Sequence, residues 1–137
     1  MNFLLVAVGS AAGGVSRWLL GTALQRRYGD VAVHVGALPF PVGTLIVNVT
    51  GSFLLGALAI IVARQSGESA LLRLLLMVGF CGGYTTFSTF SFDTVTLVEQ
   101  GTPGLAAVNV AASLALAFLA TFAGMLIMRL VLGRPLA

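Results

Sequence analysis

The feature that most constrains this chain is a series of four long apolar stretches, at residues 3–24, 42–63, 71–98 and 105–132. A helix needs about 20 apolar residues to span a bilayer, so each stretch is long enough to cross once. The segments between them are short, and residues 28–38 are expected to form a loop. The 137 residues therefore predict an all-α membrane protein with a single four-helix transmembrane domain, residues 1–137.

Charge is scarce along the whole chain. Charged residues make up 8% of the sequence, whereas an ordinary soluble domain has about 25%. A chain this apolar cannot solvate a compact surface in water, which argues against a soluble globular enzyme and against a disordered chain. The basic residues are all arginine and are scattered rather than clustered, which argues against nucleic-acid binding. A single cysteine and a single histidine argue against a disulfide or a zinc or di-iron centre.

The arginines also bear on orientation in the membrane. Four spans place both termini on one side. The second loop and the C-terminal end then collect four arginines on that side, and the first and third loops collect two on the other. This bias is weak by the positive-inside rule. We therefore predict that the chain inserts in both orientations and pairs as an antiparallel homodimer. The four are Arg64, Arg73, Arg129 and Arg134, and the two are Arg26 and Arg27.

The third stretch does not read as one continuous helix. Gly79, Gly82 and Gly83 lie close together and are followed by a run of threonine and serine residues. Paired glycines weaken a helix by about 1 kcal/mol each, so this composition predicts a break at membrane depth. The freed carbonyls can coordinate a cation, and the new helix start presents N–H groups. The alternative is close helix packing, with hydroxyls bonding back to the preceding turn.

Other residues are candidates to line a polar path. Phe87 and Phe90 share a helix face and could turn positive ring edges towards an anion, although their spacing alone favours core packing. Asn48 and Asn109 either join two helices or line the path, because an unpaired amide is costly in hydrocarbon. Ser113 lies one turn after Asn109 on the same face, which favours the path.

Arg17 and Asp93 are ionisable residues that stand out within the apolar stretches. Arg17 is about two turns from the end of the first stretch, so we expect it to reach the interface or to anchor the structure. Asp93 is expected at a solvated helix end, with a proton relay as the alternative. The sequence has no catalytic triad, paired carboxylates or phosphate loop, so transport without covalent chemistry is favoured over an enzyme. A purely structural membrane subunit is the rival interpretation.

Segments in all four stretches resemble the CrcB/Fluc family of fluoride channels. The most specific is the run GFCGGYTTFSTFS, which begins at Gly79 in the third stretch. Asn109 provides the resemblance in the fourth stretch. The other two segments are Gly43-Thr44-Leu45-x-x-Asn48-x-x-Gly51-Ser52-Phe53 and Gly13-Gly14-x-x-Arg17-Trp18.

The resemblance implies a fluoride-selective channel that conducts passively across a prokaryotic plasma membrane and lowers cytoplasmic fluoride. It implies an antiparallel, dual-topology homodimer with two pores along the interface, and so the partners are fluoride, lipid and a second copy of the chain. It also implies a structural sodium ion held by the carbonyls of Gly82 and Thr85, with Arg17 in a structural or vestibule-forming role. The pore residues implied by position are Asn48, Phe87, Phe90, Ser88, Thr89, Asn109 and Ser113.

Two alternatives compete with the channel. A proton-coupled small multidrug exporter also has four spans, but it resembles a family that needs a glutamate in the first span, and residues 3–24 contain no acid. A non-transporting assembly subunit would not need the glycine break, the hydroxyl run and the phenylalanine pair together.

Overall fold

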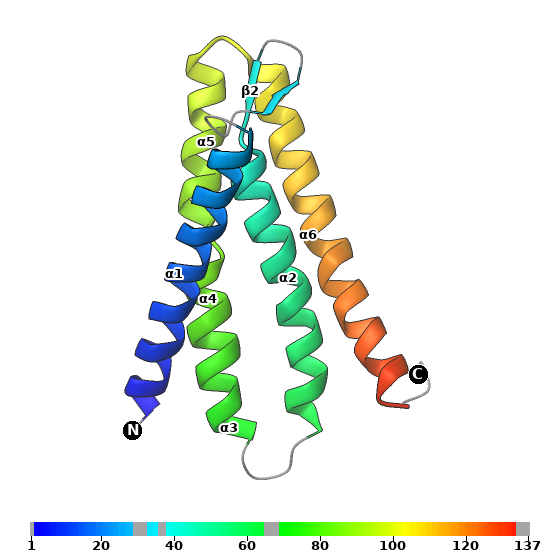
Figure 1. The fold of residues 1–137 in the computed structure, drawn as a ribbon. Helices are drawn as coiled ribbons and strands as arrows, with labels where there is room; N and C mark the ends of the chain where they lie inside the picture. Colours follow the sequence, from blue (N-terminus) through cyan, green and yellow to red (C-terminus); the bar gives the residue numbers. More distant parts are fainter. Residues whose placement is uncertain (1, 29–32, 36–37, 65–68, 134–137) are drawn as a thin grey trace.

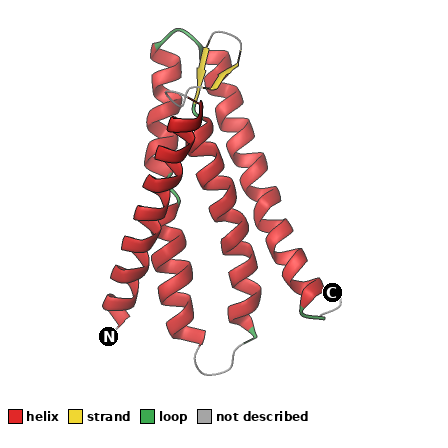
Figure 2. Ribbon diagram, in the orientation of Figure 1, coloured by secondary structure: helices red, strands yellow, loops and turns green. Residues whose placement is uncertain are grey.

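The computed structural model describes residues 2–28, 33–35, 38–64 and 69–133 of the chain. Helices form nearly all of these ranges, and two short strands and a few loop and turn residues form the rest (Figure 2). The elements are α1 (Asn2–Tyr28), β1 (Val33–Val35), β2 (Leu38–Phe40), α2 (Val42–Ala63), α3 (Ser69–Leu72), the π-helical segment η1 (Arg73–Cys81), α4 (Gly82–Tyr84), α5 (Phe87–Glu99) and α6 (Pro103–Val131).

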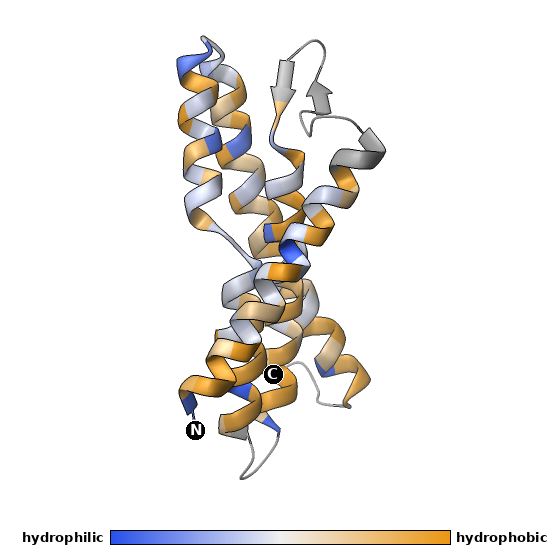
Figure 3. Cartoon of the chain, turned by 60° about the vertical axis from the view of Figure 1, so that its left-hand side comes forward, coloured by the Kyte–Doolittle hydropathy of each residue, from blue (hydrophilic) through white to orange (hydrophobic). Residues whose placement is uncertain are grey.

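Within the described residues, four helical stretches are long and apolar enough to cross a membrane, which confirms the predicted multi-pass architecture. They are Asn2–Leu24, Val42–Ala63, Ala70–Glu99 and Pro103–Val131, with mean hydropathies between 1.5 and 2.3. The third span is assembled from α3, η1, α4 and α5. Apolar residues cover most of the ribbon, and strongly polar positions are isolated (Figure 3). The protein is therefore a multi-pass membrane protein.

The helices run up and down between two ends of a bundle. Both termini lie at one end, and the strands and the turn between α5 and α6 lie at the other (Figure 1). Helix α1 packs mainly against η1 and α4, whereas α2 packs mainly against α6. Helix α5 contacts α6. The first half of the third span therefore leans on α1, and its second half leans on α6.

Glycines allow the backbone of α1 to touch the backbone of the third span. A Cβ added to Gly13 would clash with the carbonyl oxygen of Phe80, and one added to Gly83 would clash with the carbonyl oxygen of Ser10. Small residues permit such close helix approach in membranes, where dispersion contacts replace the hydrophobic effect between helices. This contact fixes the position of the third span directly before its break.

A short hairpin lies where the sequence predicted only a loop. Strands β1 and β2 pair antiparallel, with Val33 opposite Phe40 and Val35 opposite Leu38. Valine is β-branched and favours extended backbone, which explains why this stretch does not extend α1. The remainder of the expected 28–38 loop lies outside the described residues, apart from Tyr28, which ends α1. Helix α2 begins directly after this hairpin, behind Pro41.

Candidate functional site

The third span is interrupted between α4 and α5, as predicted, but the break follows the paired glycines, which are themselves helical in α4. Helix α4 ends at Tyr84, and α5 begins at Phe87. The two residues between them are extended: Thr85 has φ −83° and ψ 159°, and Thr86 has φ −149° and ψ 116°. A break at membrane depth leaves backbone groups that the protein itself must satisfy.

The side chain of Asn48 satisfies both backbone groups of Thr86. Its Nδ2 donates to the Thr86 carbonyl oxygen at 2.9 Å, and its Oδ1 accepts from the Thr86 N–H at 2.8 Å. Asn48 therefore joins α2 to the break, one of the two roles that the sequence left open. An asparagine amide has two N–H donors, so one N–H of Asn48 is not used by these bonds.

A group of three hydroxyls covers the start of α5. Thr86 is its N-cap, because Thr86 Oγ1 accepts from the Thr89 N–H at 3.2 Å. The same oxygen lies 3.1 Å from Ser88 Oγ and 3.0 Å from Thr89 Oγ1. Ser88 and Thr89 are exposed in the chain. Helix starts carry partial positive charge, so this end of α5 favours an anion.

A cavity of about 340 Å³ lies beside the break, and we call it the phenylalanine cavity. It collects residues from α2, the third span and α6. Among the described residues that line it, none carries a charged side chain. Its polar lining consists of amide, hydroxyl and backbone groups, and the remainder is two phenylalanine rings together with aliphatic and sulfur-containing side chains and glycines. Lining residues that matter below are Asn48, Ser52, Gly82, Thr85, Thr86, Phe87, Phe90 and Ser113.

Phe87 and Phe90 form one aromatic unit at this cavity. Their ring centroids are 5.4 Å apart and the ring planes are inclined by 48°. Phe87 is 77% exposed in the single chain. The spacing alone favoured core packing, but a ring this exposed does not belong to the core of the described chain. Both rings line the cavity.

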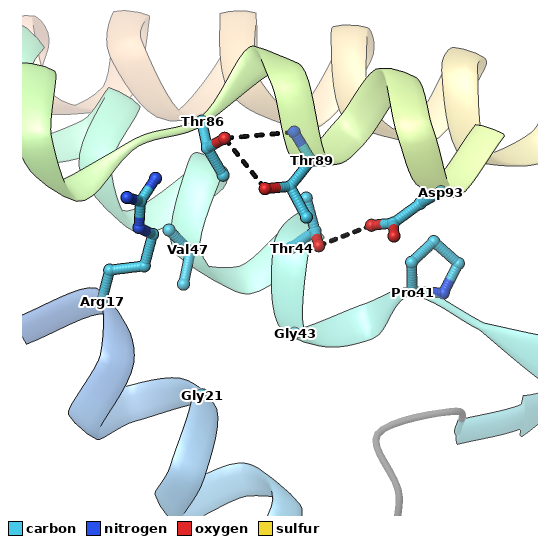
Figure 4. A pocket seen from close by; sticks show the side chains of 9 residues that line it. All are labelled: Arg17, Gly21, Pro41, Gly43, Thr44, Val47, Thr86, Thr89 and Asp93. Atoms are coloured by element: carbon cyan, nitrogen blue, oxygen red, sulfur yellow. Dashed lines mark hydrogen bonds between the residues drawn. The ribbon is translucent and has the colours of Figure 1, made fainter. Parts of the chain in front are cut away.

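A second cavity, of about 330 Å³, lies on the other side of the break, and we call it the arginine cavity (Figure 4). Arg17 on α1, Thr44 on α2, and Thr89 and Asp93 on α5 line it. Thr86, at the break, lines both cavities. It therefore lies between the arginine cavity, which has charged side chains in its wall, and the uncharged phenylalanine cavity.

Arg17 binds the break directly. Its Nη1 donates to the Thr85 carbonyl oxygen at 3.3 Å. Arg17 is half-buried and its guanidinium points towards the start of α5 (Figure 4). The hydrogen bond agrees with the anchoring role expected from the sequence, but the partner is the broken backbone rather than the membrane interface. A guanidinium is always charged, so this cavity is electropositive near the break.

Asp93 is not the solvated helix end that the sequence suggested. Its Oδ2 accepts a hydrogen bond from Thr44 Oγ1 at 2.6 Å, and the side chain is half-buried in the wall of the arginine cavity. The bond joins α2 to the middle of α5. Asp93 lies one turn after Thr89, and that spacing was the available signal for its place in the site.

The two remaining polar residues of α6 are separated by the structure. Ser113 lines the phenylalanine cavity, whereas Asn109 lines neither cavity and is only 2% exposed. Asn109 Nδ2 donates to Thr94 Oγ1 at 2.9 Å, and Ser113 Oγ donates to Asn109 Oδ1 at 3.5 Å. Asn109 thus lies behind the wall of the cavity, between α6 and α5.

The predicted residues therefore divide into three groups. Arg17 and Thr89 line the arginine cavity, and Ser88 and Asn109 line neither cavity. The phenylalanine cavity contains the other six, namely Asn48, Gly82, Thr85, Phe87, Phe90 and Ser113. Sequence reasoning gave no role to Thr86 or to the Thr44–Asp93 pair. The Thr-Thr-Phe order could have indicated Thr86, since threonine before a helix start is a common N-cap.

Similarity to known proteins extends over all four spans. Residues 4–125 match the family model described as CrcB-like protein, Camphor Resistance (CrcB). The "Fluoride-specific ion channel FluC" of Agrobacterium fabrum is 46% identical over 136 residues, 99% of this chain and 98% of that protein. The protein of the same name from Coxiella burnetii is 46% identical over 130 residues, 94% of this chain and 98% of that protein.

Proposed function

The chain belongs to the CrcB-like family, and from this premise we propose that it is a fluoride-specific ion channel that conducts fluoride passively and lowers cytoplasmic fluoride. Relatives that match this chain almost end to end are named fluoride-specific ion channels. The proposal assigns the same activity to this chain. The alternative of a proton-coupled exporter gains no support, because α1 (Asn2–Tyr28) contains no acidic residue.

The observation that carries the proposal is the neutral phenylalanine cavity beside the break. Fluoride is small and strongly hydrated, so a site that dehydrates it has to supply several hydrogen-bond donors. Asn48, Ser52, Thr86 and Ser113 place amide and hydroxyl groups around this cavity. Conduction also requires that the ion leave, and neutral donors bind an anion less persistently than a fixed cation would.

The phenylalanine rings complete this description. An aromatic edge carries partial positive charge, so a ring edge stabilises an anion without a hydrogen bond. Phe87 and Phe90 line the cavity together, with centroids 5.4 Å apart. We propose that fluoride passes along their edges, and that Arg17 attracts it into the arginine cavity beforehand. The start of α5, with Ser88 and Thr89, lies between these two regions.

Purified protein in liposomes should release fluoride much faster than chloride. The measurement is efflux from vesicles loaded with each anion, followed with ion-selective electrodes after the electrical potential is clamped with valinomycin and potassium. Protein-free vesicles and vesicles with a heat-denatured sample are the controls. Equal rates for the two anions would contradict a fluoride-specific channel, and the absence of fluoride release would contradict a channel.

We further propose that two chains pair as an antiparallel homodimer. Phe87 leaves most of its ring uncovered, and a Cβ at Gly82 would meet nothing within 4 Å, so the break face of a single chain is open. The arginine tally allows both orientations, although one of its members, Arg134, lies outside the described residues. A twofold axis would repeat every cavity of one chain in the other, which supports two pores per dimer.

Topology can be tested by placing reporters at the C-terminus. One reporter is active only in the cytoplasm, and a second is active only outside it. If the chain inserts in both orientations, both fusions should give signal. Signal from one reporter alone would refute the antiparallel arrangement. Crosslinking of a cysteine introduced at the exposed Trp18 gives the oligomeric state independently.

A sodium ion between the two chains fits the carbonyls at the break. The Thr86 N–H, which would donate to the Gly82 carbonyl in a continuous helix, is taken by Asn48 instead. The Thr85 carbonyl accepts from Arg17 with one lone pair and keeps a second. Both carbonyls lie at the C-terminal end of a helical segment, where partial negative charge favours a cation. We propose that Gly82 and Thr85 of both chains hold this structural ion.

Replacing sodium by a large organic cation should then weaken the dimer. The expected result is a lower unfolding temperature and more monomer in detergent when all buffers contain N-methylglucamine, with recovery when sodium returns. Potassium serves as the control for ionic strength. An unchanged dimer and unchanged fluoride flux without sodium would count against the ion.

A further inference from the structure

A directed chain of hydrogen bonds runs behind the phenylalanine cavity, and we propose that Asn109 and Thr94 are positioning residues that set the spacing between Phe90 and Ser113. The inference rests on the proposed fluoride conduction and deepens it. It concerns two residues that line neither cavity. It assigns Asn109 an indirect role in place of the direct contact with fluoride that the family resemblance implied.

The bonds have one consistent direction. Ser113 Oγ donates to Asn109 Oδ1 at 3.5 Å, and Asn109 Nδ2 donates to Thr94 Oγ1 at 2.9 Å. Thr94 Oγ1 in turn donates to the Phe90 carbonyl oxygen at 2.7 Å. Ser113 and Thr94 each give their one hydroxyl proton forward, and Thr94 also accepts from Asn109, so no donor is shared. The chain begins and ends at residues that line the phenylalanine cavity.

Burial makes this connection stiff. Asn109 is the one polar residue in the buried class within the described part of the chain. An amide removed from water is stabilised only while it keeps its partners, so Asn109 holds Thr94 and Ser113 at fixed distances. Within the described residues, no buried side-chain nitrogen or oxygen is left without a hydrogen bond.

The half-helix α5 needs such a second attachment. It starts anew at the break, where Asn48 and the Thr86 cap hold its first turn. Rotation of α5 about this end would swing Phe90 towards or away from Ser113. Thr94 lies one turn after Phe90 and is held from α6, which prevents that rotation. The distance between Phe90 and Ser113 across the phenylalanine cavity is therefore set by Thr94 and Asn109, which do not line it.

The test uses Thr94→Val and Asn109→Leu, singly and together, in the liposome efflux assay. Fluoride flux per folded dimer is measured against fluoride concentration, and folded protein is counted by size-exclusion chromatography. Ser91→Ala is the matched control, because Ser91 Oγ makes the same bond to the carbonyl of the other phenylalanine, Phe87, at 3.0 Å, and has no partner on α6. Thr94→Ser keeps the relay hydroxyl and should restore function.

We expect Thr94→Val to lower maximal flux per folded dimer by about fivefold, the effect of losing one hydrogen bond. Asn109→Leu should do the same, and the double variant should be no worse than either single one, because all three break one chain. Thr94→Ser and Ser91→Ala should stay within about twofold of the unmodified protein. If Asn109→Leu fails to fold, Thr94→Val and its serine rescue carry the test.

Three results would overturn the inference while leaving the channel itself intact. Normal flux in Thr94→Val combined with loss in Asn109→Leu means that Asn109 contacts fluoride directly. Multiplying effects in the double variant mean that the two residues act separately. Loss of folded protein with normal flux per remaining dimer means that the chain is structural only. Absence of fluoride flux in the unmodified protein refutes the channel itself and, with it, this inference.

Discussion

Phe87→Ile and Phe90→Ile should each remove most of the fluoride flux while leaving the folded protein intact. Isoleucine keeps an apolar side chain but has no ring edge, so the anion loses a favourable electrostatic contact in a cavity lined by uncharged residues. A barrier raised by about 1.4 kcal/mol slows conduction about tenfold. The measurement is fluoride efflux from liposomes at equal amounts of reconstituted protein.

The same half-helix offers a matched control for these two variants. Phe92 is 71% exposed, close to the 77% of Phe87, and lines neither cavity. Phe92→Ile should therefore conduct like the unmodified protein. Full flux in both Phe87→Ile and Phe90→Ile would refute the assignment of the rings to the pore. An equal loss in Phe92→Ile would mean that the phenylalanines act through packing or folding.

Asn48→Leu should destabilise the protein more than the change of any other cavity residue. The substitution leaves both the N–H and the carbonyl of Thr86 without their side-chain partner, at a depth where water is scarce. An unsatisfied buried group costs about 1–3 kcal/mol, so the two together cost about 2–6 kcal/mol. Thermal unfolding in detergent measures the loss, and fluoride flux should fall with it.

Two further variants distinguish the break from helix packing in general. Thr121→Val removes a hydroxyl on α6 whose single proton is shared between the Ser52 carbonyl of α2, at 3.3 Å, and the Ala117 carbonyl of its own helix, at 3.0 Å, so it also removes a polar contact between helices. It should cost much less than Asn48→Leu, because Ser52 lies within α2, where the helix already satisfies its backbone. Asn48→Asp keeps the acceptor for the Thr86 N–H and should be intermediate when the carboxylate is protonated. Equal unfolding temperatures for Asn48→Leu and Thr121→Val would contradict the role of Asn48 at the break.

The break itself was readable from the sequence, and its consequences were only partly so. Glycine pairs weaken a helix locally, so Gly82 and Gly83 indicated a break in this part of the span, although both remain helical and the extended residues are Thr85 and Thr86. The partner of the freed backbone could not be inferred this way. Asn48 lies 38 positions from Thr86 in the chain, and only the packing of α2 beside the third span brings its amide to that residue.

Asp93 and Asn109 illustrate the same limit. A carboxylate near the end of a span reads as solvated, yet α2 places the Thr44 hydroxyl against Asp93. Asn109 and Ser113 share a face by their spacing, which suggested one polar track. The tilt of α6 against α5 buries the first residue behind Thr94 and leaves the second at the cavity. Differences of a few ångströms between neighbouring helices decide such roles.

Local composition determines membrane insertion, the number of spans and the part of the third span that breaks. The cost of moving each residue into lipid depends on little beyond the segment itself, and so does the helix propensity of each segment. The two cavities, the attachment of Thr86 to Asn48, and the separation of Ser113 from Asn109 follow from contacts between helices far apart in the chain. Those contacts exist only after the helices pack, since side-chain direction and close backbone approach are properties of the assembled bundle.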